Sequence, residues 1–158
     1  TIDHPGTEIL HADTFTIGKQ SPLKCIEYIP TRETTNEEFP FLLTTGRTLY
    51  HFNAGTMTGR THNPELQPFD LLDISLEDAQ RLGLTDGENI LLRSRYGQVN
   101  IPIRIHSSVK PGELYTTFHN SKVFLNFITG PFRDRYVKSP EYKVTAVQIE
   151  KIKPQIDN

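Results

Sequence analysis

FPFLLTTGRTLYHFNAGTMTGR, residues Phe39–Arg60, is the stretch of the chain that decides its fold. The apolar run FPFLLTT is typical of a buried strand, and a loop rich in glycine, threonine and arginine follows it directly. A strand that leads into such a loop is a common way for a sheet to present a ligand site. Glycines let backbone amides approach a ligand, and Arg47 and Arg60 can each hold phosphate oxygens through two hydrogen bonds. The stretch therefore predicts a site for a large phosphorylated ligand, with an ordinary surface loop as the alternative.

Short strands dominate the sequence on the C-terminal side of this stretch. FDLLDIS, NILLRSR, QVNIPIRI, ELYTTF and YKVTAVQIEKI are the candidates. Between the first two, SLED has the spacing of a capping box at Ser75 and predicts a short helix over LEDAQRL that ends at Gly83. Tyr96-Gly97 predicts a two-residue hairpin turn, and Pro102 predicts an edge strand or a bulge. Short strands with one or two small helices predict a mainly β fold, a small β-barrel.

The first part of the chain, residues 1–38, is polar and rich in turn-forming residues, and we interpret it as an arm. Within it only the runs ILH and CIEYI look extended, and Cys25 in the second run is expected to be buried. The predicted organisation is this arm, a barrel over residues 39–153 and a tail over residues 154–158. The chain does not begin with Met, and we expect it to be a fragment of a longer protein.

Composition excludes several classes of protein. Of the 158 residues, 17 are Lys or Arg and 19 are Asp or Glu, so the net charge of −2 does not favour nucleic acid. The single cysteine, Cys25, excludes an internal disulfide or a thiolate cluster, and the six histidines lack metal-ligand spacing. No apolar run approaches the roughly 18 residues of a membrane span, and no signal-peptide pattern opens the chain.

Catalytic motifs are also missing from the sequence. The glycine-rich loop matches neither GxxxxGK[ST] nor GxGxxG, and no GxSxG motif accompanies His51. We therefore expect His51 to form hydrogen bonds rather than to act as a general base. The chain contains no Gly-Ser dipeptide, which excludes a decarboxylase that makes its pyruvoyl group by cleavage at that bond. The sequence predicts no catalytic residue and no metal ligand.

Several pieces of the chain, taken in order, resemble one family. They are LLTTGRTLYHFNAGTMTGR, DISLEDAQRLGLTDGENILLRSRYGQVNIPIRI, VKPGELYTTFHN, NFIT and SPEYKVTAVQIEKI. These pieces are similar to successive motifs of the C-terminal molybdopterin-dinucleotide-binding domain of molybdenum or tungsten oxidoreductases related to dimethyl sulfoxide reductase. The resemblance extends over about Phe39 to Lys153. The arm HPGTEILHADTFTIGK with IEYIP resembles the approach to this domain in formate dehydrogenase catalytic subunits, although nitrate reductases share most of the motifs.

The resemblance implies a double-psi β-barrel like that of aspartate decarboxylase, with short helices. It implies a bis(molybdopterin guanine dinucleotide) cofactor with Mo or W, held partly here and partly by upstream domains of the same polypeptide. The metal ligand, the catalytic residues and any iron–sulfur cluster are expected in that upstream part, so this chain alone should not oxidise formate. Electron-transfer subunits are possible partners, and no membrane insertion is expected. The expected compartment is the cytoplasm, or the periplasm if a twin-arginine signal lies upstream.

The family's binding residues can be carried over position by position. The amide of Asn126 can both donate to and accept from a heterocycle edge, and Lys143 supplies a point charge for phosphate or pterin oxygens. Relatives commonly have HxHTGTMT where this chain has HFNAGTMT, so Asn53 and Ala54 replace a His and a Thr, and Ala54 loses a hydroxyl. The expected cofactor-binding residues are Thr45, Gly46, Arg47, Thr48, Leu49, Tyr50, His51, Phe52, Asn53, Ala54, Thr56, Phe118, His119, Asn126 and Lys143.

The expected function is that of the cofactor-binding C-terminal domain of a molybdopterin oxidoreductase, in the first place a formate dehydrogenase. One alternative is another oxidoreductase of the same superfamily, such as a nitrate reductase. A second alternative is a non-catalytic double-psi barrel that binds proteins or nucleotides, because one fold can carry many functions.

Overall fold

The structure is a computed structural model that describes residues 2–13, 15–20 and 22–152. The chain divides into two units, Thr1–Pro30 and Thr31–Asn158. The first unit ends within the arm expected over residues 1–38. The predicted tail over residues 154–158 and the last residue of the predicted barrel, Lys153, lie outside the described residues.

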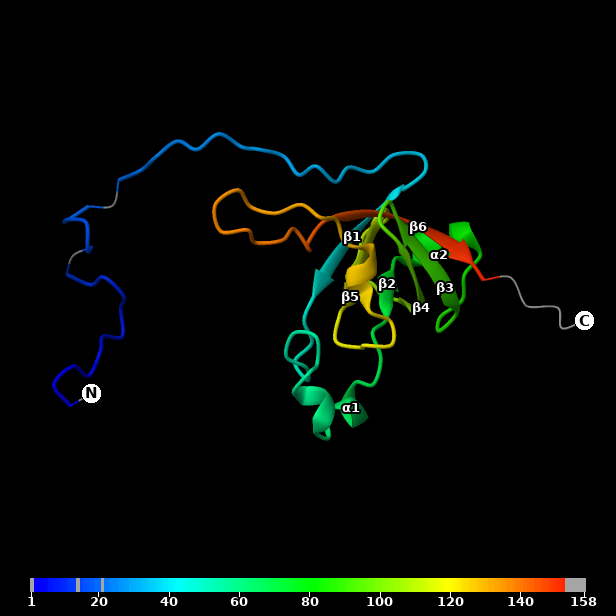
Figure 1. Cartoon of the computed structure of the whole chain (residues 1–158), viewed down its shortest axis with the longest axis horizontal. Helices are drawn as coiled ribbons and strands as arrows, with labels where there is room; N and C mark the ends of the chain where they lie inside the picture. The colour runs from blue at the N-terminus through cyan, green and yellow to red at the C-terminus, as the bar shows by residue number, and fades with distance from the viewer. Residues whose placement is uncertain (1, 14, 21, 153–158) are drawn as a thin grey trace, which may run out of the picture. The chain divides into compact units, whose positions relative to one another are not determined.

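Six strands of the second unit close into a barrel in the order β1-β5-β2-β4-β3-β6 (Figure 1). The pairs β1–β5 and β2–β4 are parallel, and the other four pairs are antiparallel. This mainly β, closed barrel with short helices confirms the predicted double-psi fold class. The strands are β1 (Phe41–Gly46), β2 (Leu72–Ile74), β3 (Asn89–Ser94), β4 (Gln98–Ile105), β5 (Glu113–Thr117) and β6 (Thr145–Lys151).

The helix α2 (Leu76–Leu82) follows β2 and has both predicted caps. The Ser75 hydroxyl oxygen accepts a hydrogen bond from the Asp78 backbone N–H, and Gly83 ends the helix at φ 64°. The second half of the expected capping box differs, because the Asp78 carboxylate accepts from the Ser75 hydroxyl and from the Gly112 N–H. The other short helices are η1 (Thr58–Arg60), α1 (Asn63–Leu66) and η2 (Leu125–Ile128). No helix in the described part of the chain is long and apolar enough to cross a membrane.

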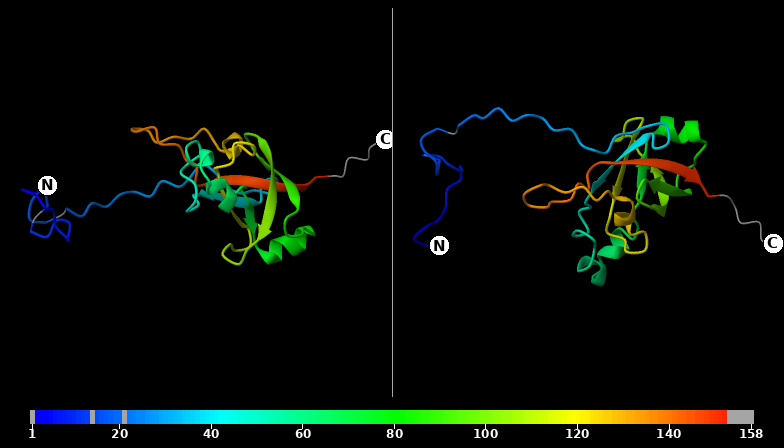
Figure 2. Two further views of the ribbon diagram at one scale, coloured as in Figure 1. Left: turned by 90° about the horizontal axis from the view of Figure 1, so that it is seen from below. Right: turned by 45° about the horizontal axis from the view of Figure 1, so that its top comes forward.

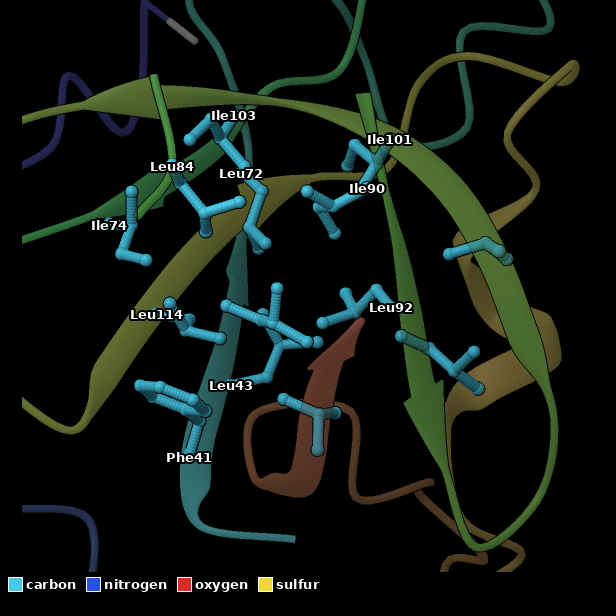
Figure 3. Packing of buried hydrophobic residues seen from close by; sticks show 14 of the residues in the cluster. Phe41, Leu43, Leu72, Ile74, Leu84, Ile90, Leu92, Ile101, Ile103 and Leu114 are labelled. Carbon is cyan, nitrogen blue, oxygen red and sulfur yellow. The ribbon is translucent and has the colours of Figure 1, made fainter. Parts of the chain in front are cut away.

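Alternate residues of the strands fill the interior of the barrel, where their side chains point toward one another (Figure 3). On β4 the buried residues Val99, Ile101 and Ile103 alternate with less buried ones, as in a strand with one face in the core. Burying each large apolar side chain stabilises the fold by roughly 1.5–3 kcal/mol, so this core is its main source of stability. The fully buried apolar residues include Leu43, Leu72, Ile74, Ile90, Leu92, Ile101, Ile103, Leu114 and Val147.

Three local expectations are wrong. Pro102 does not lie on an edge strand, because a closed barrel has no edge; pairing of β4 with β3 ends at Pro102, and pairing with β2 starts at Ile103. Cys25 is exposed rather than buried, since the run around it forms no strand. The run ILH, residues 9–11, is not extended as expected: it lies in a bend and turn, with His11 at φ 58°.

A buried carboxylate anchors the segment before β1. Glu33 is 3% exposed, and it accepts hydrogen bonds from the Tyr96 hydroxyl at 2.5 Å, the Arg95 guanidinium at 3.3 Å and the Ala146 N–H at 2.9 Å. Burial and the hydrogen bond to Glu33 together raise the pKa of Tyr96 to about 12. Glu33 thereby holds the turn between β3 and β4, in which three residues rather than two separate the strands.

Residues 129–144, between η2 and β6, form a long loop that projects from the barrel (Figure 2). Within this loop, Arg133 and Pro140 form an isolated antiparallel β-bridge. The segment from His119 to Pro140 contains no strand or helix of the barrel apart from η2.

Candidate functional site

The loop after β1 folds back on itself around His51. This side chain is buried, with Nδ1 3.0 Å from the Thr58 hydroxyl and Nε2 2.9 Å from the carbonyl oxygen of Gln67. A carbonyl oxygen can only accept, so Nε2 of His51 donates to it. His51 therefore forms hydrogen bonds, as predicted. Within the loop, Asn53 has φ 50°, a backbone conformation that Asn tolerates better than most residues.

A second histidine, His119, lies directly against the first. The two rings stack with their centroids 4.1 Å apart and their planes 9° apart. His119 follows β5, and its Nε2 lies 3.2 Å from the same Gln67 carbonyl oxygen. Burial lowers the pKa of His119, against the nearby Asp70 charge, which raises it. Gly55 closes the contact between the two segments, because a Cβ on it would lie 2.7 Å from the His119 carbonyl oxygen.

A polar cavity of about 490 Å³ opens beside the stacked rings. We use this name for the hollow lined by His51, Ala54, Gly55, Thr56, Gly59, Arg60, Pro64, Gln67, Pro68, His119, Asn120, Ser121 and Lys122. Arg60 and Lys122 give its lining two cationic side chains, and the lining contains no carboxylate. Glycine backbone, a threonine hydroxyl and cationic side chains are groups that bind phosphate.

An apolar cavity of about 100 Å³ shares one wall with the polar cavity. The shared wall consists of Ala54, Thr56, Asn120 and Ser121. The rest of the apolar cavity is lined by Phe118, Phe124, Leu125 and Asn126. Its aromatic side chains and the amides of Asn120 and Asn126 suit the face and the edge of a planar heterocycle. Six of the predicted site residues thus line the two adjoining cavities: His51, Ala54, Thr56, Phe118, His119 and Asn126.

Asn126 also lines a third hollow, the aromatic groove, of about 450 Å³. It comprises Tyr96, Asn126, Phe127, Thr129, Gly130, Pro131, Arg133 and Tyr142. Tyr142 and Lys143 contact the end of β1: the Thr45 hydroxyl donates to the Tyr142 carbonyl oxygen at 2.8 Å, and Lys143 Nζ donates to the Thr45 carbonyl oxygen at 2.6 Å. Asn126 and Tyr142 thus line the same groove, whereas Lys143 binds the end of β1 and lines none of the three hollows.

The other predicted site residues lie outside these three hollows. Arg47 lies over the Phe52 ring at 5.6 Å, and Leu49 is fully exposed. Tyr115 packs so closely on Gly46 that a Cβ there would overlap its hydroxyl. The residues outside the hollows are Thr45, Gly46, Arg47, Thr48, Leu49, Tyr50, Phe52, Asn53 and Lys143.

Sequence reasoning missed several residues of the polar cavity. Asn120, Ser121 and Lys122 belong to the run HNSK, which begins two residues after the end of β5, and polar residues that follow a strand were the available signal. Gln67, which lines the polar cavity, precedes an apolar strand, a position with no such signal. In the described ranges, no three His, Cys, Asp or Glu side chains gather as metal ligands do.

Comparison with known proteins assigns the chain to a family. The family described as "Molydopterin dinucleotide binding domain" matches residues 41–146. Both cavities and the aromatic groove lie within this range.

Individual relatives agree with the family match. The chain is 37% identical to the "F420-dependent formate dehydrogenase 2 subunit alpha" of Methanococcus maripaludis, over 96% of the chain but only 23% of that relative. It is 30% identical to the "Periplasmic nitrate reductase" of Desulfovibrio desulfuricans, over 94% of the chain and 22% of the relative. Its fold is similar to that of acetylene hydratase from Pelobacter acetylenicus, with a TM-score of 0.63 and 15% identity over 73% of the chain and 19% of the hydratase. The chain thus spans about a quarter of the length of its relatives.

Proposed function

Because the chain belongs to the molybdopterin dinucleotide-binding domain family, we propose that it is the C-terminal cofactor-binding domain of a formate dehydrogenase. In this proposal the cofactor is bis(molybdopterin guanine dinucleotide) with Mo or W, shared with upstream domains of the same polypeptide. The metal of the bound cofactor supplies the two-electron chemistry that converts formate to CO₂. This chain supplies position and charge, and it is inactive alone.

The observation that carries the proposal is the pairing of the two cavities. The polar cavity has Arg60 and Lys122 in its lining and no carboxylate, which fits the charge of a pyrophosphate. The adjoining apolar cavity has two aromatic rings and the amide of Asn126, which fit a heterocycle. A dinucleotide has both parts, joined, so two cavities that share a wall suit it better than either cavity alone.

The roles of individual residues follow from their positions. Thr56 and Asn120 present a hydroxyl and an amide to both cavities, and Asn126 presents an amide to the apolar one. Lys143 would hold the end of β1 and add positive charge beside the aromatic groove. The remaining predicted residues of the loop, from Thr45 to Asn53, are proposed to contact the cofactor in the complete protein, where upstream domains add the rest of the site.

The wider context is proposed on the same basis. Residues 1–38 lead from the upstream domains, residues 39–153 form the binding barrel, and residues 154–158 are a tail. An iron–sulfur cluster and electron-transfer subunits would belong to the upstream part. The proposed compartment is the cytoplasm, with the periplasm as the alternative.

The experiment that tests the substrate uses the longest polypeptide that contains this chain. The purified protein is assayed for formate oxidation and for nitrate reduction with the same artificial electron carrier. Formate oxidation without nitrate reduction supports the proposal. Nitrate reduction alone would favour the second candidate, a nitrate reductase. The 30% identity to the Desulfovibrio enzyme supports this candidate. A protein without bound dinucleotide would contradict both.

The assigned residues are tested separately through cofactor content. Asn126→Ala and Lys143→Ala are each expected to lower the molybdenum or tungsten bound per polypeptide. Lys110→Ala is a suitable control, because this exposed lysine lies outside both cavities and the aromatic groove. Unchanged metal content in Asn126→Ala and Lys143→Ala would contradict the assigned roles.

A further inference from the structure

Asp70 is a completely buried carboxylate that borders the candidate site without lining either cavity. One of its oxygens, Oδ1, accepts hydrogen bonds from the Thr117 hydroxyl at 2.5 Å and from the His119 N–H at 3.2 Å. The other, Oδ2, accepts from the Asn120 N–H at 2.9 Å. A buried carboxylate is costly unless several donors satisfy it, so these contacts hold residues 117–120, at the end of β5, and the carboxylate together.

The fold explains why the carboxylate lies there. β2 pairs with β5 in antiparallel register from Ile74–Leu114 to Leu72–Thr116. Continued by two residues, this register sets Asp70 opposite Phe118, just beyond the last strand pair. The backbone N–H groups of His119 and Asn120 have no β2 partner at this point, and the Asp70 side chain takes the place of the strand.

The Asp70 charge also acts on the His119 ring. Nδ1 of His119 lies 2.7 Å from Oδ1 of Asp70 without a hydrogen bond between them, so the Asp70 charge acts on this ring by favouring its protonated form. In the described part of the chain, His119 is the one basic side chain within ion-pair distance of Asp70. The ring of His51 stacks on that of His119, and His51 is the second titratable group whose charge acts on His119.

The residues next to Asp70 complete this support. The Gln67 carbonyl oxygen contacts Nε2 of both stacked histidines, and the Pro68 carbonyl oxygen lies 3.5 Å from Nδ2 of Asn120. The segment 67–70 thus holds the rings of His51 and His119 and the chain at Asn120. These three residues line the polar cavity.

We propose that Asp70 is the positioning residue of the dinucleotide site: its carboxylate fixes residues 117–120 at the end of β5 and the orientation of His119, and thereby the polar wall of the cavity. The inference rests on the proposed function. It assigns to Asp70 no contact with the ligand. Its effect on binding passes through His119 and Asn120.

The first test measures the titration of the His119 ring by NMR in the 158-residue chain. Asp70→Asn removes the negative charge but keeps the size of the side chain, so the midpoint of the His119 titration should fall by about 1 pH unit or more. Asp73→Asn is the matched control. Asp73 is also a buried carboxylate, and it forms an ion pair with Arg104, the residue opposite it on β4. An unchanged midpoint in folded Asp70→Asn would overturn the proposal.

The second test measures guanine dinucleotide content, as GMP released by acid hydrolysis, in the longest protein that contains the chain. Asp70→Asn should lower the content roughly tenfold, and Asp73→Asn should not. Thr117→Val serves if Asp70→Asn does not fold: it removes one hydrogen bond and keeps the charge, so the content should fall about threefold with the His119 midpoint unchanged.

The two tests separate the inference from the proposed function. Absence of the dinucleotide from the wild-type protein would contradict the proposed function and, with it, the role of Asp70 in binding. A loaded wild-type protein whose content changes in neither Asp70→Asn nor Thr117→Val would overturn the inference alone.

Discussion

The imidazole rings of His51 and His119 lie face to face, 4.1 Å apart and within 9° of parallel. His51 belongs to the loop after β1, and His119 follows β5, so this contact joins two segments that are distant in sequence and whose strands pair in parallel. Both rings meet the carbonyl oxygen of Gln67. The stack therefore forms the inner wall of the polar cavity.

The free energy of unfolding should depend on pH through His119. Burial lowers the pKa of His119 in the folded state below its ordinary value of 6.5, so the unfolded chain takes up the proton first as the pH falls. The stabilisation is complete above about pH 6.5 and is lost progressively below it. Chemical denaturation between pH 7.5 and 5 should show this loss in the wild type.

His119→Gln should make the stability less dependent on pH in this window. His62→Gln is the control, because His62 is almost fully exposed and pairs with the exposed Glu65. An equal loss of stability with falling pH in the wild type and in His119→Gln would show that another group is responsible.

Gly97→Ala should disturb the position of Asn126. A Cβ on Gly97 would lie 2.5 Å from the Phe127 carbonyl oxygen, so η2 would have to move away from the turn between β3 and β4. Such overpacking typically costs about 1–3 kcal/mol of unfolding free energy, measured by denaturant titration. Gly59→Ala is the matched control for stability, because nothing lies within 4 Å of its added Cβ. Equal stability of the two variants would contradict the close packing of η2 on this turn.

Glu33→Gln should loosen the segment before β1 and change the titration of Tyr96. The variant keeps the size of the side chain but weakens the hydrogen bonds to Tyr96, Arg95 and Ala146, at a cost of roughly 1–3 kcal/mol. The Tyr96 pKa of about 12 should fall, as seen by ultraviolet absorbance against Tyr96→Phe.

The raised pKa of Tyr96 also predicts behaviour at high pH. The unfolded chain loses the phenol proton near pH 10, while the folded chain keeps it to about pH 12, so the wild type should lose stability across this range. Glu37→Gln, at an exposed position in the same segment, should behave like the wild type. A Glu33→Gln variant with an unchanged Tyr96 titration would contradict the anchoring role of Glu33.

Much of the barrel could be predicted from local patterns. The alternation in β4 and the caps Ser75 and Gly83 depend on residues close together in the chain, which is why the hairpin and α2 were predictable. Pro102 was misplaced because the strand's neighbours on each side are set by barrel closure, which no local pattern encodes. Cys25 was misplaced because an apolar run does not by itself form a strand.

Some features of the candidate site could likewise be predicted from local sequence, and others could not. The loop from Gly46 to Arg60 stands out by composition, and His51 was rightly expected to form hydrogen bonds. Its stacking on His119 and the support from Asp70 depend on the pairing of β5 with both β1 and β2, which brings together residues about 50 to 70 positions apart. Such contacts follow from topology and leave no local trace in the sequence.

The central claim is that the polar cavity binds the phosphates of a guanine dinucleotide. The most direct measurement is the guanine nucleotide bound per polypeptide in the double variant Arg60→Ala, Lys122→Ala, compared with the wild type and with Lys110→Ala, each purified in the longest protein that contains the chain. We predict a loss of about tenfold or more in the double variant, because both cations of the cavity are gone, and no loss in the control. Equal nucleotide content in all three proteins would contradict the claim.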